Sequence, residues 1–406
     1  MRSPQVSHAS KRARQFVTTR TVATFLSLIY ALGYTAFLGP EKRSVLTFVL
    51  ASSMIFTVTF TSGLSLFIRS RPKEEINSQV IYPYIVLSIF AAILAAIASV
   101  STLLIYANYR TPIPNVLILL CFLYAFLSCF TLSLLDGLIA TGLLRFSMLL
   151  DLAMVLIQVF VGVLFVFLNQ TSQIVMILFS FLASYSIVAF SILTLLVFLF
   201  PITRINFVLE AKALFLKSRN FNIIGISTGI ADRADKLVIG FLLPLEVLGK
   251  YALITGILTF NRFLPEAIAK SVFFANEPDS MNGNAKPSLL KNVLIICAVF
   301  CFTLFAWIFV TFSFGDEWRL TFSFAAAFAL QELLRARYQI NSTKMISAKR
   351  EERIISSSRF LLISTLVVLP LFTHYLGVYG PSLGLSLIYI GLGYYTKINK
   401  DLKGQK

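Results

Sequence analysis

Four charged residues interrupt the apolar stretch GIADRADKLVIGFLLP (229–244): Asp232, Arg233, Asp235 and Lys236. On a helix with about 100° between residues, the two acids and Lys236 fall within about 100° of arc, and Arg233 lies at the edge of that face. Asp232 and Lys236 are four residues apart with the acid first, which is the favourable order for an ion pair. The spacing therefore predicts one polar helix face that is partly self-neutralised.

Three more apolar stretches carry polar stripes at helical spacing. The stripe after residue 248 contains Thr255, Thr259, Arg262, Glu266 and Lys270. The stripe after residue 318 contains Gln331, Arg335, Tyr338 and Ser342, with Glu332 and Arg337 beside it. A weaker one, between residues 147 and 168, contains Ser147, Asp151 and Gln158.

Charges at these positions suggest a cavity inside a membrane protein. One charge at the bilayer centre costs about 3 kcal/mol on insertion scales, so such residues usually face a protein interior or a water-filled path. Guanidinium groups bind phosphate and carboxylate through charge-assisted hydrogen bonds. We therefore select as anion-binding candidates Arg233, Arg262, Arg335, Lys236 and Gln331.

The acids have two possible roles in such a cavity. They can balance the cations, or they can bind H⁺ or Na⁺ to couple transport. The candidates for either role are Asp232, Asp235, Glu266 and Asp151. A purely structural role, in which these groups only hold helices together, is equally compatible with the Asp232–Lys236 pair and is favoured for the single Ser and Thr residues.

The composition requires elements that can position these groups in lipid. Of the 406 residues, 57% are hydrophobic and only 13% are charged, and the mean hydropathy is +0.83. Apolar runs of about 20 residues match the length that a membrane-spanning helix needs. The predicted spans are 20–39, 44–68, 80–107, 113–135, 147–168, 174–200, 220–243, 248–273, 289–313, 318–341, 357–375 and 378–397. The prediction is an all-α polytopic membrane protein with about twelve spans and no soluble catalytic domain.

The distribution of basic residues predicts the topology. The net charge is +17, but most of the 35 Lys and Arg residues fall in the tails and in alternate loops. The opposite loops hold only Lys42, Arg43, Arg110, Lys250 and Arg319. By the positive-inside rule, both termini are cytoplasmic, so the charge reflects topology and does not predict a nucleic-acid partner. The four cysteines all fall inside spans without a histidine nearby, so we expect no metal site and no cofactor.

The chain divides into two halves around an amphipathic stretch. Residues 201–219 mix four basic residues with Ile, Phe and Leu, as a helix lying on the inner membrane surface would. The predicted lobes are 1–200 and 220–406, with six spans each. FLGPE (37–41) and FLLPLE (241–246) share the pattern F-L-x-P at an offset of half the chain, which indicates a parallel repeat of the kind found in transporters.

Two segments resemble the Wzx-type oligosaccharide flippases of the multidrug/oligosaccharidyl-lipid/polysaccharide exporter superfamily. FLGPEKRSVLTFVLASSMIFTVTFTSGLSLFIRS (37–70) resembles the family's first turn and second helix, although Ser44 stands where glycine is usual. DRADKLVIGFLLPLEVLGKYAL (232–253) resembles its seventh helix and the turn that follows. In that segment the matching residues are Asp235, Ile239, Gly240, Phe241, Leu242, Glu246, Gly249 and Tyr251. LGVYGPSLGLSLIYI (376–390) is similar to the turn into the last helix of the family.

The resemblance implies two six-helix lobes around a central cavity. It also implies that alternating access moves a polyprenyl-diphosphate-linked glycan from the inner to the outer leaflet of a bacterial cytoplasmic membrane, for cell-surface polysaccharide biosynthesis. The expected partners are this lipid-linked glycan and membrane lipid, with the chain working as a monomer near other polysaccharide-assembly proteins. Two alternatives stay open: a cation-coupled multidrug exporter of the same fold and, with less support, an integral-membrane glycosyltransferase or polymerase.

Overall fold

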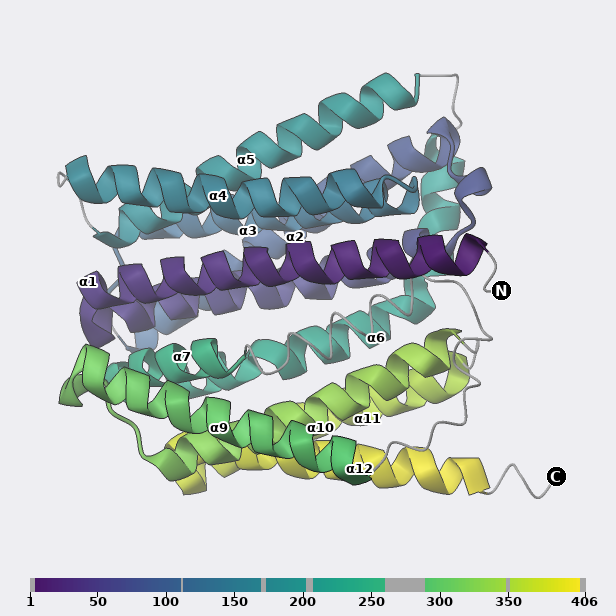
Figure 1. The fold of residues 1–406 in the computed structure, drawn as a ribbon. Helices are drawn as coiled ribbons and strands as arrows, with labels where there is room; N and C mark the ends of the chain where they lie inside the picture. The colour runs from purple at the N-terminus through teal and green to yellow at the C-terminus, as the bar shows by residue number, and fades with distance from the viewer. Residues whose placement is uncertain are drawn as a thin grey trace. The chain divides into compact units, whose positions relative to one another are not determined.

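The computed structural model describes residues 4–110, 112–168, 173–201, 207–259, 289–347 and 351–401. Nearly all of them are helical, and the described residues form no strand (Figure 1). This confirms the predicted all-α class. A helix satisfies every backbone hydrogen bond within its own segment, which is why long apolar sequences adopt it in lipid.

The first helix, α1 (Pro4–Ser70), contains the first two predicted spans. It is interrupted at Gly39, whose φ of 70° and ψ of 164° are not helical. This positive φ favours glycine, and Pro40, which has no backbone N–H, restarts the helix. Gly249 lies against this break, where a Cβ atom would overlap the Pro40 carbonyl.

The remaining helices are α2 (Ser78–Tyr109), α3 (Asn115–Ala140), α4 (Leu144–Leu168), α5 (Gln173–Leu199), α6 (Phe207–Leu242), α7 (Leu245–Leu258), α9 (Leu289–Phe314), α10 (Phe322–Ser347), α11 (Glu351–Leu376) and α12 (Gly380–Asp401). Helices α2 to α5 and α9 to α12 match predicted spans with ends that differ by up to about six residues, whereas α6 begins well before its span and residues 260–273 of the eighth span lie outside the described residues. Both copies of the F-L-x-P pattern coincide with a helix break, because α6 ends at Leu242 and Pro244 precedes α7. The described part of the amphipathic stretch, from Phe207, is continuous with the seventh span in α6.

Hydropathy separates the helices into two kinds. Six described segments are long and apolar enough to cross a membrane: Thr21–Ser70, Ser78–Tyr109, Asn115–Ala140, Leu144–Phe165, Gln173–Leu199 and Glu352–Gly393. Helices α6 and α10, of 36 and 26 residues, are not among these segments, and both contain charged residues in their described parts. These two helices carry most of the candidate residues.

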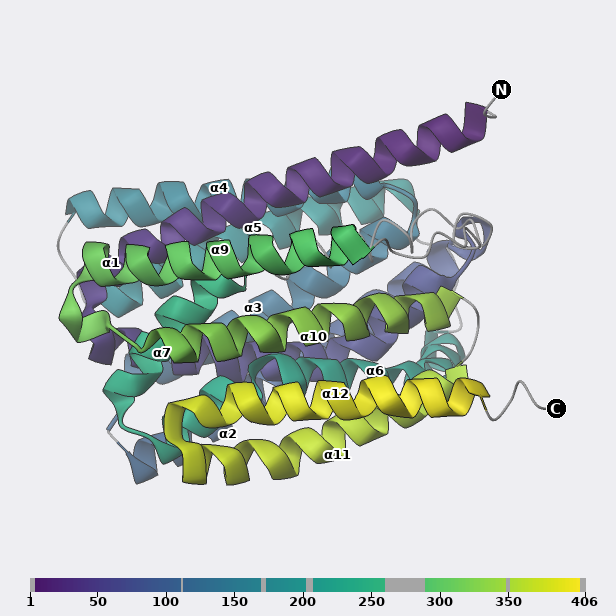
Figure 2. The same ribbon diagram turned by 60° about the horizontal axis from the view of Figure 1, so that its bottom comes forward.

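The chain forms two compact units. One comprises Val45–Leu237, in which α3 packs against α2 and α5, and α5 also packs against α4. Its core includes Ala91, Ala92, Ala95 and Cys129, with phenylalanines packed around them. The other comprises Met1–Ser44 and Val238–Lys406, in which α12 packs against α10 and α11 (Figure 2). The division into lobes 1–200 and 220–406 stays a prediction.

Candidate functional site

The four charges that interrupt residues 229–244 lie within α6, near the middle of the predicted seventh span. Asp235 is buried, with 4% of its surface exposed, whereas Asp232, Arg233 and Lys236 are half-buried. They belong to the Val45–Leu237 unit. On the helical wheel Asp235 lies at one edge of the predicted polar face and Arg233 at the other, so burial is greatest at the Asp235 edge.

The polar stripe on α10 forms a cluster buried inside the other unit. Gln331, Glu332 and Arg335 are 1%, 2% and 3% exposed. Arg335 Nη1 donates to Glu332 Oε1 at 3.4 Å, and Gln331 Nε2 donates to the same oxygen at 3.5 Å. The helix brings these groups together because residues three and four apart share one face. Burial of an ion pair this completely is costly, which makes the cluster the strongest candidate on this helix.

Glu332 belongs to this buried cluster but is not among the candidates selected from the sequence. It was placed beside the stripe because its angle on the helical wheel lies off the centre of the polar face. Its spacing from Arg335, three residues with the acid first, is the signal that identifies it as the charge partner. Arg337 lies two residues beyond Arg335 and is exposed.

The other selected residues are Asp151, Arg262 and Glu266. Asp151 is half-buried on α4. Arg262 and Glu266 lie outside the described residues. The described part of their stripe consists of Thr255 and Thr259, and both hydroxyls form hydrogen bonds within the helix. Thr255 Oγ1 donates to Tyr251 O at 2.7 Å, and Thr259 Oγ1 donates to Thr255 O at 2.6 Å. These two hydroxyls therefore have a structural role.

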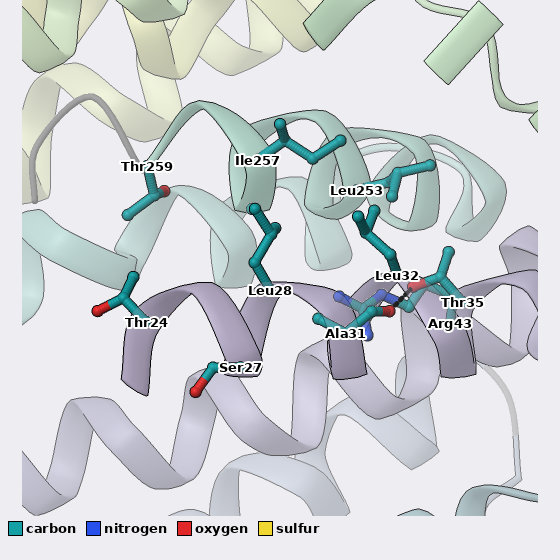
Figure 3. A pocket seen from close by; sticks show the side chains of 11 residues that line it. Thr24, Ser27, Leu28, Ala31, Leu32, Thr35, Arg43, Leu253, Ile257 and Thr259 are labelled. Atoms are coloured by element: carbon teal, nitrogen blue, oxygen red, sulfur yellow. Dashed lines mark hydrogen bonds between the residues drawn. The ribbon is translucent and has the colours of Figure 1, made fainter. Parts of the chain in front are cut away.

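A cavity of about 200 Å³ lies between α1 and α7, within the Met1–Ser44 and Val238–Lys406 unit (Figure 3). Its walls include Thr24, Leu28, Thr35, Arg43, Leu253 and Ile257. Among the described residues that line it, Arg43 alone is charged. The pattern of basic residues places Arg43 in an outside turn and does not predict this cavity, because residues on α7 and on the first part of α1 are more than 200 positions apart in the sequence.

The break in α1 explains how Arg43 reaches the cavity. The reversal of φ at Gly39 lets the side chain turn back toward the preceding helical segment, where its guanidinium carbon lies 4.6 Å from the centre of the Tyr34 ring. Arg43 is 8% exposed. Its Nε and Nη1 atoms are buried and have no hydrogen-bond partner in the described part of the chain. The Tyr34 ring offers a cation–π contact but no hydrogen-bond acceptor in that geometry.

No protein-family model matches the chain, and no curated protein matches it either. Solved structures do. One is the inward-facing conformation of a multidrug resistance MATE family transporter of the MOP superfamily, with a TM-score of 0.65 and 14% identity, covering 95% of this chain and 98% of that one. Another is the lipid II flippase MurJ in an inward closed conformation, with a TM-score of 0.64 and 14% identity, covering 95% of this chain and 87% of that one.

A third similar structure is the Vibrio cholerae MATE transporter VcmN in the bent form, with a TM-score of 0.57 and 12% identity. The match covers 99% of each chain. At such identities the likeness concerns the arrangement of helices and does not identify individual side chains. The chain has the fold that is shared by multidrug transporters and a lipid flippase of the MOP superfamily.

Proposed function

We propose that this chain is a MOP-superfamily transporter that moves a polyprenyl-diphosphate-linked oligosaccharide from the inner to the outer leaflet. The observation that carries the proposal is the buried cluster of Gln331, Glu332 and Arg335 on a helix of a transporter fold. A guanidinium that is buried with a carboxylate and an amide is a strong ligand for an anionic group when a transport path opens beside it. The resemblance of residues 37–70 and 232–253 to oligosaccharide flippases supports this class of substrate.

The proposed roles follow from charge. Arg335, Arg233 and Arg262 would bind the diphosphate and any acidic sugars, assisted by Lys236 and Gln331. Asp232, Asp235, Glu266 and Asp151 would balance these cations and bind H⁺ or Na⁺ during the transport cycle. The proposed location is the bacterial cytoplasmic membrane, with both termini in the cytoplasm and the protein acting as a monomer.

Arg335→Gln tests the proposal, with Arg337→Gln as the matched control two residues away on the same helix. In a deletion strain, complete glycan lipids should accumulate on the inner leaflet, and the wild-type gene should release them. We expect Arg335→Gln to reduce release roughly 10- to 100-fold, the value of one or two hydrogen bonds to a charged group, and Arg337→Gln to leave it unchanged. A membrane-impermeant glycosidase on right-side-out vesicles reports the leaflet.

Two results would contradict the proposal. One is normal glycan export and unchanged lipid pools in the deletion strain. The other is wild-type release by an Arg335→Gln protein that is present in the membrane at the wild-type amount. Protein quantity must therefore be measured in the same vesicles.

The alternative function, cation-coupled drug export, has one observation in its favour. Asp235 is a buried acid on α6, and exporters of organic cations need a carboxylate facing an apolar path. The MATE transporters among the structural neighbours have the same fold. This function would be favoured if the deletion strain were hypersensitive to cationic dyes and if the wild-type gene, but not Asp235→Asn, restored resistance. Because these neighbours are transporters, the glycosyltransferase alternative gains no support from the fold.

A further inference from the structure

The cavity between α1 and α7 has the features of a binding site rather than of a packing defect. Empty cavities in proteins are usually apolar, whereas this one contains the buried guanidinium of Arg43. Leaving a buried charged group without hydrogen bonds costs several kcal/mol. A ligand that accepts hydrogen bonds from Nε and Nη1 of Arg43 would remove this cost.

The charge of the cavity limits the charge of its ligand. Arg43 is the one charged residue among the described lining residues, so a single negative charge balances it. A phosphodiester carries one negative charge, while the diphosphate of the proposed transport substrate carries more. Oxyanions of phosphate bind guanidinium through charge-assisted hydrogen bonds, and no second cation is needed.

The shape and chemistry of the walls specify the rest of the ligand. Figure 3 shows the blue nitrogen atoms of Arg43 near Thr35 at one end and the hydroxyls of Thr24 and Thr259 at the other. Between these ends the walls are formed by Leu28, Leu32, Leu253 and Ile257. From Thr35 to Thr24 a helix rises about 16 Å, so the cavity is long, narrow and apolar in the middle. Such a slot fits a hydrocarbon chain attached to the oxyanion.

The predicted topology gives the depth of the cavity in the membrane. It places residues 40–43 at the outer surface of the membrane, where phospholipid phosphates lie, and places Thr24 toward the inner side along the same helix. A phosphate at Arg43 would then have its chain directed into the bilayer along α1, in the orientation of an outer-leaflet lipid.

We propose that the cavity between α1 and α7 binds a membrane phospholipid, with the phosphodiester on Arg43 and the start of one acyl chain along Leu28, Leu253 and Ile257. This lipid is a bound component of the protein and not its transport substrate. The proposal rests on the cavity and on the predicted topology, and it does not depend on the glycan substrate.

Native mass spectrometry of the purified full-length protein, titrated with dihexanoylphosphatidylglycerol, tests the proposal. Two variants change the site in different ways. Arg43→Gln removes the charge, and Gly256→Leu fills the cavity, since Gly256 lines it and a Cβ atom there meets nothing within 4 Å. Arg319→Gln is the matched control, because that side chain is 55% exposed in the same unit and pairs with Asp316.

We expect Arg43→Gln to weaken binding about tenfold or more, the value of a hydrogen bond to a charged group. Gly256→Leu should weaken binding as well, because its side chain occupies the space of the ligand, and Arg319→Gln should bind as the wild type does. Dihexanoylglycerol, which has the same chains and no phosphate, should bind the wild type at least about tenfold more weakly. If Arg43→Gln does not fold, Gly256→Leu decides the question, because it keeps the charge and adds its side chain to open space.

Three results would overturn the proposal. Equal binding of the phosphatidylglycerol by wild type and Gly256→Leu would place the lipid elsewhere. Displacement of the lipid by inorganic phosphate at equal concentration would indicate a site for a free anion. Tighter binding of farnesyl diphosphate than of the phospholipid, lost in Arg43→Gln, would assign the cavity to the transport path for isoprenoid diphosphates.

Discussion

The bundle of α2 to α5 and the bundle of α10 to α12 bury polar groups of different kinds. In the first bundle the buried polar groups are neutral, and some of them bond across helices: Tyr84 donates to the Ser133 carbonyl at 2.6 Å, and Gln158 donates to the Ser184 hydroxyl at 3.1 Å. In the second bundle, α10 buries the Glu332–Arg335 ion pair. Neutral hydrogen bonds stabilise helix contacts in lipid at small cost, whereas buried charges are expensive to retain.

Together with the proposed function, this difference predicts different roles for the two bundles. The α2 to α5 bundle has the composition of a scaffold, with small residues such as Ala92 and Ala95 fully buried at its helix contacts. Small residues let helix backbones approach closely, which is the main source of packing energy in a membrane. In the proposed function, the charged groups of the α10 to α12 bundle bind the substrate. Variants of each region test whether this difference in roles holds.

The largest effect should come from breaking the buried ion pair. Glu332→Ala removes the carboxylate that accepts from Arg335 and Gln331, so a guanidinium that is 3% exposed loses its charge partner. Breaking a buried pair in this way typically costs 3–5 kcal/mol, so we expect roughly that loss in the free energy of unfolding. Thermal unfolding of the purified protein in detergent measures it.

The double variant Glu332→Gln/Arg335→Gln is the control for this prediction. It removes both charges and keeps polar side chains of similar size, so it should recover much of the lost stability. If the double variant is as unstable as Glu332→Ala, the cluster is held by packing and not by charge, and the contrast with the α2 to α5 bundle fails.

The sequence predicts the helices of this fold well because their signal is local. Runs of about 20 apolar residues bounded by basic loops define α2, α3, α4 and α5 with ends that differ by a few residues from the observed ones. The break in α1 is also local, since Gly39-Pro40 specifies it. Helical spacing likewise places Gln331 and Arg335 on one face and brings them to one buried cluster.

Contacts between distant segments could not be predicted from the same sequence. The sequence shows that Arg43 is charged, but its burial follows from the packing of α1 against α7. The spacing of residues in the sequence does not predict that packing. The burial of Asp235 beside three half-buried charges is another case, because a helical wheel gives the direction of a side chain and not what covers it. The division of the chain into lobes depends on such contacts as well.

A middle-sized effect should come from the close approach of α6 to the second part of α1, in the Val45–Leu237 unit. A Cβ atom on Gly225 of α6 would overlap the hydroxyl of Ser62 on α1, and one on Gly229 would overlap Val58. We expect Gly225→Val to destabilise the protein by about 1–3 kcal/mol, the usual cost of overpacking. Thermal unfolding in detergent again measures it.

Gly33→Ala provides the contrast for Gly225→Val. A Cβ atom on Gly33 meets nothing within 4 Å, and alanine favours a helix interior over glycine by roughly 0.5–1 kcal/mol. This variant should be as stable as the wild type or slightly more so. If Gly225→Val and Gly33→Ala were equally stable, the stability of the Val45–Leu237 unit would not depend on the contact between α6 and α1.

The smallest effect should come from a neutral hydrogen bond in the α2 to α5 bundle. Tyr84 is fully buried, and Tyr84→Phe keeps its ring while removing the bond to the Ser133 carbonyl. Hydrogen bonds between membrane helices average about 0.6 kcal/mol and reach about 1.7, so the loss should lie in that range and well below that of Glu332→Ala. Tyr109→Phe, at a side chain that is 80% exposed, should change nothing measurable. If Tyr84→Phe lost as much free energy of unfolding as Glu332→Ala, neutral and charged buried groups would be equally important to stability. The burial of charge on α10 would then no longer distinguish that bundle from the α2 to α5 bundle.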